Sequence, residues 1–436
     1  MRGGLRHAGG SDLTMIRDHF LARLLTAALV AGSLGALAFA APKHEAPPKH
    51  ATKPSAVSAA PKKEPPRNKD EPLVNAPHAI LIDAENGSVL YERDADRLIY
   101  PASLAKLMTT EYVFHEIKEG HIKLTDEYPV SENAWRKGGA PSHGSTMFAA
   151  IHSKVPVDDL LHGMIIQSAN DACIVLAEAL AGDEATFGEK LTQRAREIGL
   201  SKSVFTNSNG LPDPNERVTT HELAKLARHI ILDYPEFYPI FGQPEFTWNK
   251  IRQPNRNPLL GSITGADGLK TGFTKEAGYG IVGSAVQDGV RLIVVVNGEK
   301  TAKERADEAK KLLEWGFRSF ETRNLFAEGQ LIGSAKVYGG ASGSVPLQAQ
   351  GVVKIMVPKS GGEKLIARIA YQGPVPAPIE QGQRIGELRV WRDDKLVLQV
   401  PLKAAVSVAR GNMPGRALDA VTELVISVFR AGAERL

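Results

Sequence analysis

Strand-like runs stand at both ends of one long segment of this chain, and helical patterns fill the middle. Near its start, apolar residues 79–83 and 89–91 flank an Asn-Gly dipeptide, which is typical of a tight hairpin turn. Near its end, residues 279–285 and 291–296 form a second pair of such runs, and Gln287-Asp288-Gly289 between them predicts another hairpin connection. The pattern predicts an α+β domain whose sheet draws on both ends of the segment.

The middle of the segment repeats apolar residues at helical spacing. This spacing runs from residue 157 to 181 and continues through 187–198 and 219–231. The last of these begins with a Thr-Thr-His-Glu capping pattern. A final helix over residues 303–320 has its apolar side chains on one stripe, and it closes the domain.

A second region of β-structure follows. Residues 352–357, 365–371, 385–391 and 396–402 are predicted strands separated by Gly, Pro and charged turns. Short strands at such regular spacing are typical of a small β-sandwich. Residues 414–436 then place apolar side chains on one helical face and charges of both signs elsewhere. This amphipathic helix either lies in a membrane interface or packs on the sandwich.

The first forty residues have the features of an export signal. Basic residues precede the apolar run 24–37, and Ala38-Phe39-Ala40 ends it with a small-x-small site. The run is shorter than a membrane span requires. We expect cleavage after Ala40 and export to the periplasm or the extracytoplasmic face of the membrane. An uncleaved anchor and a buried helix are the alternatives.

These patterns divide the chain of 436 residues into five parts. The second is a linker rich in Pro and Lys, where repeated proline favours extended conformations and little apolar surface is left to bury. The parts are a signal peptide (1–40), the linker (41–75), the α+β domain (76–323), the β-sandwich domain (324–410) and the C-terminal amphipathic helix (411–436).

Composition excludes several kinds of site. The chain has one cysteine, Cys173, so it forms no intrachain disulfide and no multi-cysteine metal site. The chain has a formal charge of +4, and its basic residues are concentrated in the proline-rich linker. The charge is therefore only weak support for nucleic-acid binding. We expect no metal, no cofactor and no nucleic-acid partner.

The segment 101–110 sets a hydroxyl and an amine three residues apart at the start of an apolar helix. Ser103 and Lys106 therefore lie one turn apart on one face. A lysine amine removes a serine proton if burial or nearby positive charge keeps the amine neutral. Ser103 is thus a candidate nucleophile and Lys106 its candidate base. The alternative is an ordinary serine near a helix start with a solvated lysine.

Two further motifs lie in the same domain. Ser168 and Asn170 begin one helical pattern, and residues 267–272, with Lys-Thr-Gly at their end, lead into the strand at 279. Taken singly, they are an ordinary helix cap and an ordinary turn before a strand. Together with the first motif they complete the ordered set Ser-x-x-Lys, Ser-x-Asn and Lys-Thr-Gly, a signature already known for β-lactamases and penicillin-binding proteins.

On these motifs the chain resembles the low-molecular-mass penicillin-binding proteins, the serine D-alanyl-D-alanine carboxypeptidases. The resemblance runs through nearly all of residues 78–408, and it implies a penicillin-binding/β-lactamase-like catalytic domain in which a helical cluster packs on an antiparallel sheet. A β-rich domain and an amphipathic tail follow in many members. The matching segments are residues 101–109, 168–172, 209–211, 267–274, 277–279 and 315–317.

The resemblance implies hydrolysis of the terminal D-Ala-D-Ala bond of peptidoglycan pentapeptide stems, with release of D-alanine and less crosslinking. Ser103 would form the acyl-enzyme after Lys106 takes its proton. Ser168 and Lys270 would relay a proton to the leaving amine, and Asn170 would hold the substrate amide and Lys106. β-Lactam antibiotics would acylate the same serine.

A substrate with a free carboxylate needs a cation or hydroxyl donors. Thr271 supplies a hydroxyl, and Lys270 and Gly272 complete the substrate-binding strand, whose N–H would join that of Ser103 in an oxyanion hole. The resemblance adds an arginine early in the closing helix, where Arg305 stands, and arginine pairs bidentately with carboxylates. Several relatives place His before Gly-Leu where this chain has Asn, so no role is assigned to that side chain.

Three other functions share these features. A β-lactamase normally adds a Glu-x-x-Leu-Asn segment between the second and third motifs, which this chain lacks. A D,D-endopeptidase uses the same site to cut crosslinked peptidoglycan. A catalytically inactive envelope protein would only bind peptidoglycan, and the intact motifs count against it. The expected partners are the stem pentapeptide, β-lactams and, through the C-terminal helix, the periphery of the inner membrane.

Overall fold

The computed structural model describes residues 72–362 and 364–413. The predicted signal peptide, nearly all of the linker and all but the first three residues of the predicted C-terminal part lie outside the described residues. Over the described ranges, no helix is both long and apolar enough to cross a membrane.

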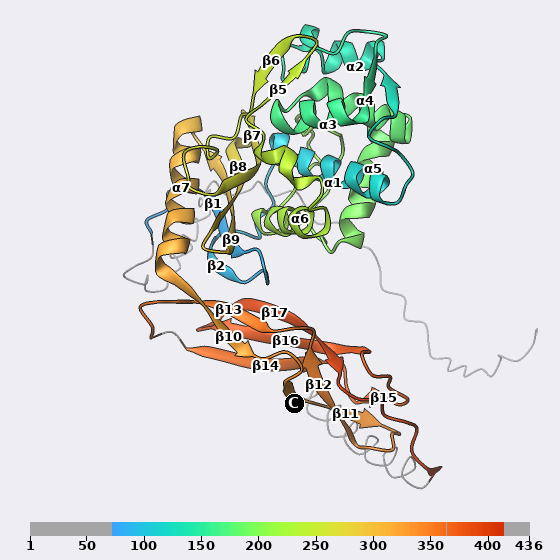
Figure 1. Ribbon diagram of the computed structural model, residues 1–436, viewed down its shortest axis with the longest axis vertical. Helices are drawn as coiled ribbons and strands as arrows, with labels where there is room; N and C mark the ends of the chain where they lie inside the picture. Colours follow the sequence, from blue (N-terminus) through green and yellow to red (C-terminus); the bar gives the residue numbers. More distant parts are fainter. Residues whose placement is uncertain (1–71, 363, 414–436) are drawn as a thin grey trace, which may run out of the picture. The chain divides into compact units, whose positions relative to one another are not determined.

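The first domain is built on an antiparallel sheet of five strands in the order β2-β1-β9-β8-β7 (Figure 1). Strand β1 pairs with β9, with Ile80 opposite Val295, so the N-terminal hairpin joins the late strands as expected. The strands are β1 (His78–Asp83), β2 (Val89–Arg93), β7 (Ala266–Thr274), β8 (Gly278–Gln287) and β9 (Val290–Glu299).

Helices cover both faces of this sheet. Six of them gather on one side and α7 (Ala302–Ser319) packs on the other (Figure 1). The six are α1 (Lys106–Lys118), α2 (Glu132–Lys137), α3 (Val157–Ile166), α4 (Asn170–Ala181), α5 (Glu184–Glu197) and α6 (Thr220–Asp233). The remaining short elements are η1 (Ala102–Ala105), η2 (Ala140–Ser142), η3 (Tyr238–Gly242), β3 (Glu127–Pro129), β4 (Lys154–Pro156), β5 (Glu245–Trp248) and β6 (Ile251–Pro254).

Side chains of the sheet alternate between two apolar clusters. Ile80 and Ile82 of β1 pack with the six-helix side, whereas Leu81 between them packs with Leu312 of α7. This is the period of two expected for a strand that is covered on both faces. A side chain at Gly316 would lie within 2.8 Å of Leu81, so glycine lets α7 approach the sheet closely.

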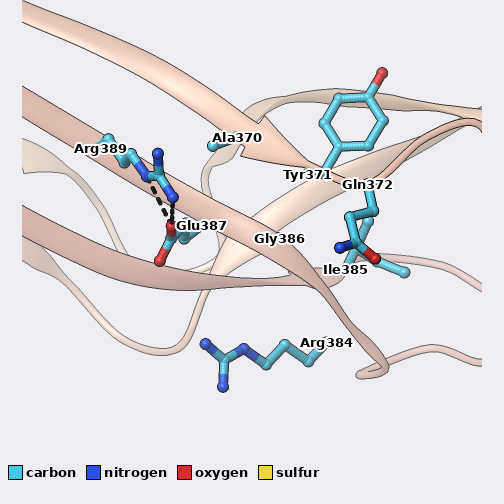
Figure 2. Close-up of a pocket in the computed structure, with 8 residues that line it drawn as sticks. All are labelled: Ala370, Tyr371, Gln372, Arg384, Ile385, Gly386, Glu387 and Arg389. Atoms are coloured by element: carbon cyan, nitrogen blue, oxygen red, sulfur yellow. Dashed lines mark hydrogen bonds and ion pairs between the residues drawn. The ribbon is translucent and has the colours of Figure 1, made fainter. Parts of the chain in front are cut away.

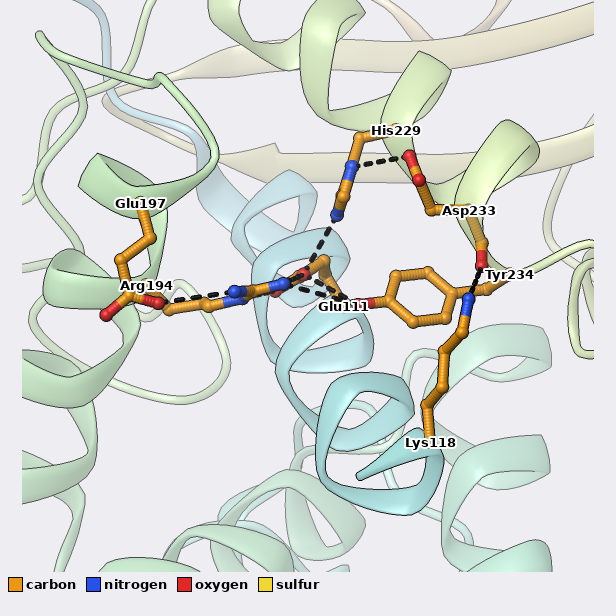
Figure 3. A network of polar contacts seen from close by, with 7 residues as sticks. All are labelled: Glu111, Lys118, Arg194, Glu197, His229, Asp233 and Tyr234. Atoms are coloured by element: carbon orange, nitrogen blue, oxygen red, sulfur yellow. Dashed lines mark hydrogen bonds and ion pairs between the residues drawn. The ribbon is translucent and has the colours of Figure 1, made fainter. Parts of the chain in front are cut away.

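A buried carboxylate joins three helices on the six-helix side (Figure 3). Glu111 of α1 is fully buried and accepts hydrogen bonds from Arg194 of α5 at 2.9 Å, from His229 of α6 at 3.1 Å and from the Tyr234 hydroxyl at 3.0 Å. Burial alone would raise the pKa of Glu111, but the hydrogen bonds from His229 and Arg194 lower it below its ordinary value. The helix that begins at Lys106 is thus anchored by charge as well as by apolar packing.

The second domain is β-structure throughout its described residues. A six-stranded sheet in the order β14-β16-β17-β12-β11-β15 and the pair β10-β13 contribute to one apolar core, which confirms a β-rich domain. The strands are β10 (Phe320–Phe326), β11 (Leu331–Tyr338), β12 (Ser344–Ala349), β13 (Val353–Pro358), β14 (Leu365–Tyr371), β15 (Val375–Pro376), β16 (Arg384–Arg392) and β17 (Lys395–Ala404).

Candidate active site

The first motif lies at the junction of η1 and α1. Ser103 belongs to η1, and Lys106 begins α1 with its side chain fully buried. Lys106 Nζ lies 3.0 Å from Ser103 Oγ and donates a hydrogen bond to the carbonyl oxygen of Asn209 at 2.6 Å. Burial therefore excludes the alternative of a solvated lysine.

Two glycines allow other segments to reach the serine. A side chain at Gly210 would lie 1.9 Å from the carbonyl oxygen of Ala102, and one at Gly272 would lie 3.1 Å from the backbone nitrogen of Ser103. Gly272 brings strand β7 against η1, which places the Lys-Thr-Gly segment beside Ser103, the candidate nucleophile. Ala102 itself has a φ of +48°, a backbone conformation that non-glycine residues adopt rarely and that is often found at active sites.

Both motif lysines lie in surroundings that favour the neutral amine. Burial lowers the pKa of Lys106, and the nearby Arg256 guanidinium lowers it further. Lys270 of β7 is 3% exposed, and its Nζ donates to the Thr271 carbonyl at 3.0 Å. Burial, followed by the positive charges of Lys106 and Arg256, holds the pKa of Lys270 well below its ordinary value. An uncharged amine is the form that can accept the serine proton.

The second motif stands where α4 begins. Ser168 is 2% exposed, has a φ of +63°, and its hydroxyl has no hydrogen-bond partner among the described residues. Asn170 is the first residue of α4, and its backbone N–H donates to the Ser145 carbonyl at 2.7 Å. A buried hydroxyl without a partner is available to a substrate or to a proton in transit.

Arg305 lies in the first turn of α7, beside the start of β8. Its guanidinium carbon lies 5.9 Å from the ring centre of Tyr279, which in turn stacks on Phe273 at 4.0 Å between centres. Arg305 is 8% exposed, and its Nε finds no partner in the described part of the chain. Burial lowers the pKa of Arg305, so an incoming carboxylate would meet a poorly solvated cation.

Sequence reasoning missed three groups at this site. The Asn209 carbonyl is a backbone group, and the type of side chain at this position does not indicate that the carbonyl binds Lys106. Asp171 is fully buried and accepts from the Thr146 hydroxyl at 2.6 Å and the Met147 N–H at 3.0 Å, which holds the loop before α3 against α4. Arg256 has no motif around it that marks it as a site residue.

Arg256 reaches the second motif from a loop outside it. Its Nη1 donates to the Ser145 hydroxyl at 2.6 Å and its Nε to Gln167 Oε1 at 3.2 Å, next to Ser168. The residue therefore adds positive charge where both lysines must stay neutral.

A separate pocket lies in the second domain (Figure 2). It is formed by strands β14 and β16 and contains none of the motif residues, so it is not part of the candidate active site. Its lining residues are Ala370, Tyr371, Gln372, Arg384, Ile385, Gly386, Glu387 and Arg389. Across residues 72–362 and 364–413, no cluster of three His, Cys, Asp or Glu side chains is arranged to hold a metal ion.

Two family models match the chain. The model described as D-alanyl-D-alanine carboxypeptidase matches residues 66–301, and the model described as penicillin-binding protein 5, C-terminal domain, matches residues 320–410. The first covers the domain that carries the three motifs, and the second covers the β-rich domain.

Named relatives match most of the chain. D-alanyl-D-alanine carboxypeptidase DacC of Escherichia coli is 40% identical over 355 residues, which span 81% of this chain and 89% of that protein. DacA of Haemophilus influenzae is 37% identical over 361 residues, spanning 82% of this chain and 91% of the relative. The crystal structure of penicillin binding protein 5 from Haemophilus influenzae superposes with a TM-score of 0.67 at 38% identity, covering 78% of this chain and 99% of that one.

These matches confirm the predicted family and the α+β fold class with a β-rich second domain. The chain belongs to the D-alanyl-D-alanine carboxypeptidase family, the serine hydrolases among the low-molecular-mass penicillin-binding proteins.

Proposed function

We propose that this chain removes the terminal D-alanine from peptidoglycan pentapeptide stems through an acyl-enzyme on Ser103. The observation that carries the proposal is the fully buried Lys106 amine, whose pKa is lowered and whose Nζ lies 3.0 Å from Ser103 Oγ. A neutral amine at hydrogen-bond distance is the base that a serine nucleophile requires.

The reaction would proceed in two steps. Ser103 Oγ bonds to the carbonyl carbon between the two D-alanines as its proton passes to Lys106, and the C–N bond then breaks as a proton reaches the leaving amine through Ser168 and Lys270. Water next attacks the ester, releases the shortened peptide and restores the hydroxyl. Backbone N–H groups of Ser103 and of the residue after Gly272 would bind the oxyanion.

The substrate carboxylate would bind beside β7. The hydroxyl of Thr271 would bind it together with Arg305, which is buried and whose Nε has no hydrogen-bond partner within residues 72–362 and 364–413. Asn170 would bind the substrate amide. Because a buried cation without a counter-ion is costly, a carboxylate partner would recover part of that cost.

Export and membrane attachment complete the proposal. Peptidoglycan stems lie outside the cytoplasm, which agrees with residues 1–40 acting as a signal peptide. Residues 411–436 would attach the enzyme to the periphery of the inner membrane by their apolar face. The five-part division of the chain given above belongs to the same proposal.

The test uses purified protein, a pentapeptide mimic and labelled penicillin. We expect release of D-alanine and covalent labelling that is located at Ser103 by peptide mass mapping, and we expect Ser103→Ala to lose both. Continued labelling of Ser103→Ala would overturn the nucleophile assignment. If the wild type is labelled but cuts only crosslinked dimers, the endopeptidase alternative is correct.

A further inference from the structure

The Ser208–Asn209 segment lies against the helix that begins with the candidate base. The Asn209 carbonyl accepts from Lys106 Nζ at 2.6 Å, and the Ser208 carbonyl accepts from the Thr109 hydroxyl at 2.7 Å. Thr109 stands one turn after Lys106 on α1. Two successive carbonyls of this segment therefore bind one face of α1, and the position of the segment decides where the Lys106 amine is held.

Helix α5 contacts Phe205 and Thr206, which come just before this segment. The Thr192 hydroxyl donates to the Phe205 carbonyl at 2.8 Å and accepts from the Phe205 N–H at 2.9 Å. A side chain at Gly188 would lie 2.5 Å from the backbone of Thr206, so α5 and this strand of chain are in direct contact.

Glu184, at the first turn of α5, makes the third of these contacts. Its Oε1 accepts from the Ser208 hydroxyl at 2.8 Å and from Asn209 Nδ2 at 3.4 Å. Glu184, Gly188 and Thr192 are four residues apart in turn, which places all three on one face of the helix. Both Ser208 and Asn209 are almost fully buried, so their side chains have little access to water as a substitute partner.

We propose that Glu184 is a positioning residue for Lys106, because its carboxylate holds the Ser208 and Asn209 side chains and thereby fixes the Asn209 carbonyl. A neutral amine that donates one N–H to this carbonyl directs its lone pair toward the Ser103 hydroxyl. If the carbonyl moves, the amine rotates and proton removal slows. The inference rests on the proposed role of Lys106 as the base.

The test compares variants by the second-order rate of acylation with labelled penicillin between pH 4 and pH 9. Glu184→Ala should lower the plateau rate about tenfold and move the acidic limb to lower pH by about half a unit. The shift has this sign because the protonated amine loses a well-placed acceptor and a nearby negative charge, both of which favour the charged form.

Matched variants separate position from charge and from folding. Glu184→Gln keeps an oxygen acceptor for Ser208 and should stay within about threefold of the wild-type plateau. Glu189→Gln, an exposed residue on the same helix, should match the wild type in both plateau and limb. Rates are normalised to the amount of protein that penicillin finally labels, so that unfolded protein does not enter the comparison.

Three results would overturn the inference: a wild-type profile for Glu184→Ala, a lower plateau without any shift of the limb, or a loss in Glu184→Gln as large as in Glu184→Ala. D-alanine release by the same wild-type preparation is scored separately. A wild type that is acylated without releasing D-alanine would remove the carboxypeptidase proposal and leave the Glu184 comparison intact.

Discussion

At the scale of single residues, burial favours the uncharged forms of ionisable side chains around the candidate nucleophile Ser103. The Lys106 and Lys270 amines and the Glu216 carboxyl are each at most 3% exposed, and burial shifts the pKa of each toward the neutral form. The Glu216 charge would favour protonated Lys106, and burial raises the pKa of Glu216 to about 8. A neutral Glu216 therefore leaves Lys106 able to act as a base at neutral pH.

Replacing Glu216 by Gln tests whether the folded protein holds this carboxyl in its neutral form, because the pH dependence of the free energy of unfolding should then change. The folded-state pKa of about 8 lies above the ordinary 4.5, so wild-type stability is complete below pH 4.5 and falls as the pH rises toward 8. Glu216→Gln stays neutral at every pH. The difference between its free energy of unfolding and that of the wild type should therefore increase in favour of the variant as the pH rises across this window, by about 1.4 kcal/mol per unit of pKa difference. Urea unfolding at pH 4.5 and pH 8.5 measures the gain. A difference that does not change with pH would contradict the prediction.

At the scale of elements, α1 depends on the buried Glu111 for its attachment to α5 and α6. Glu111→Gln removes the buried counter-charge of Arg194, which keeps only its ion pair with the more exposed Glu197, and should cost roughly 3 kcal/mol of the free energy of unfolding at pH 7, near the low end for a broken buried pair because Arg194 is partly exposed. Since the folded-state pKa of Glu111 is lowered, the wild-type advantage should persist above pH 4.5 and fade below it.

Urea unfolding at pH 7 and pH 4 measures this cost. The matched control is Glu119→Gln, an exposed carboxylate at the end of the same helix, which should change the free energy of unfolding by less than about 0.5 kcal/mol. Equal losses in the two variants would show that the network does not stabilise α1.

Elements with strong local signals could be predicted from the sequence, and elements without them could not. The turn between β8 and β9 was expected from Asp288-Gly289, and both residues adopt positive φ there. Strand β7 was expected as a strand only through the resemblance to the family. The residues by themselves indicated an ordinary turn before a strand, because Gly268, Lys270 and Gly272 do not give the alternation of a half-buried strand. Glycine is present in β7 because η1 approaches it closely, and that contact is tertiary. Strands β11 and β12 were likewise not predicted.

At the scale of the whole molecule, the site is assembled from pieces that are remote in sequence. The start of α1, the loop at residue 209 and strand β7 are in contact there, and Arg305 in the first turn of α7 lies near enough to Lys270 of β7 to affect its charge. A common sheet from both ends of the domain makes this possible. The motifs allowed candidate reacting side chains to be proposed from the sequence. They could not identify the Asn209 carbonyl, since a backbone acceptor is selected by the path of the chain and not by residue type.

The C-terminal segment is proposed to hold the whole enzyme at the membrane, near its substrate. The sequence of residues 411–436 predicts a helix with Leu418, Val421, Val425 and Phe429 on one face and charges of both signs elsewhere, a pattern that suits a membrane interface. A chain that ends at residue 410 should therefore move from the membrane to the soluble fraction on cell fractionation, while its acylation by penicillin stays unchanged because no motif residue is removed.

A matched full-length variant with Val421→Asp and Val425→Asp should also be released, since it keeps the length and loses only the apolar face. An unchanged distribution of both variants would show that the tail packs on protein, and a released truncation with a retained double variant would show that length, not the apolar face, matters.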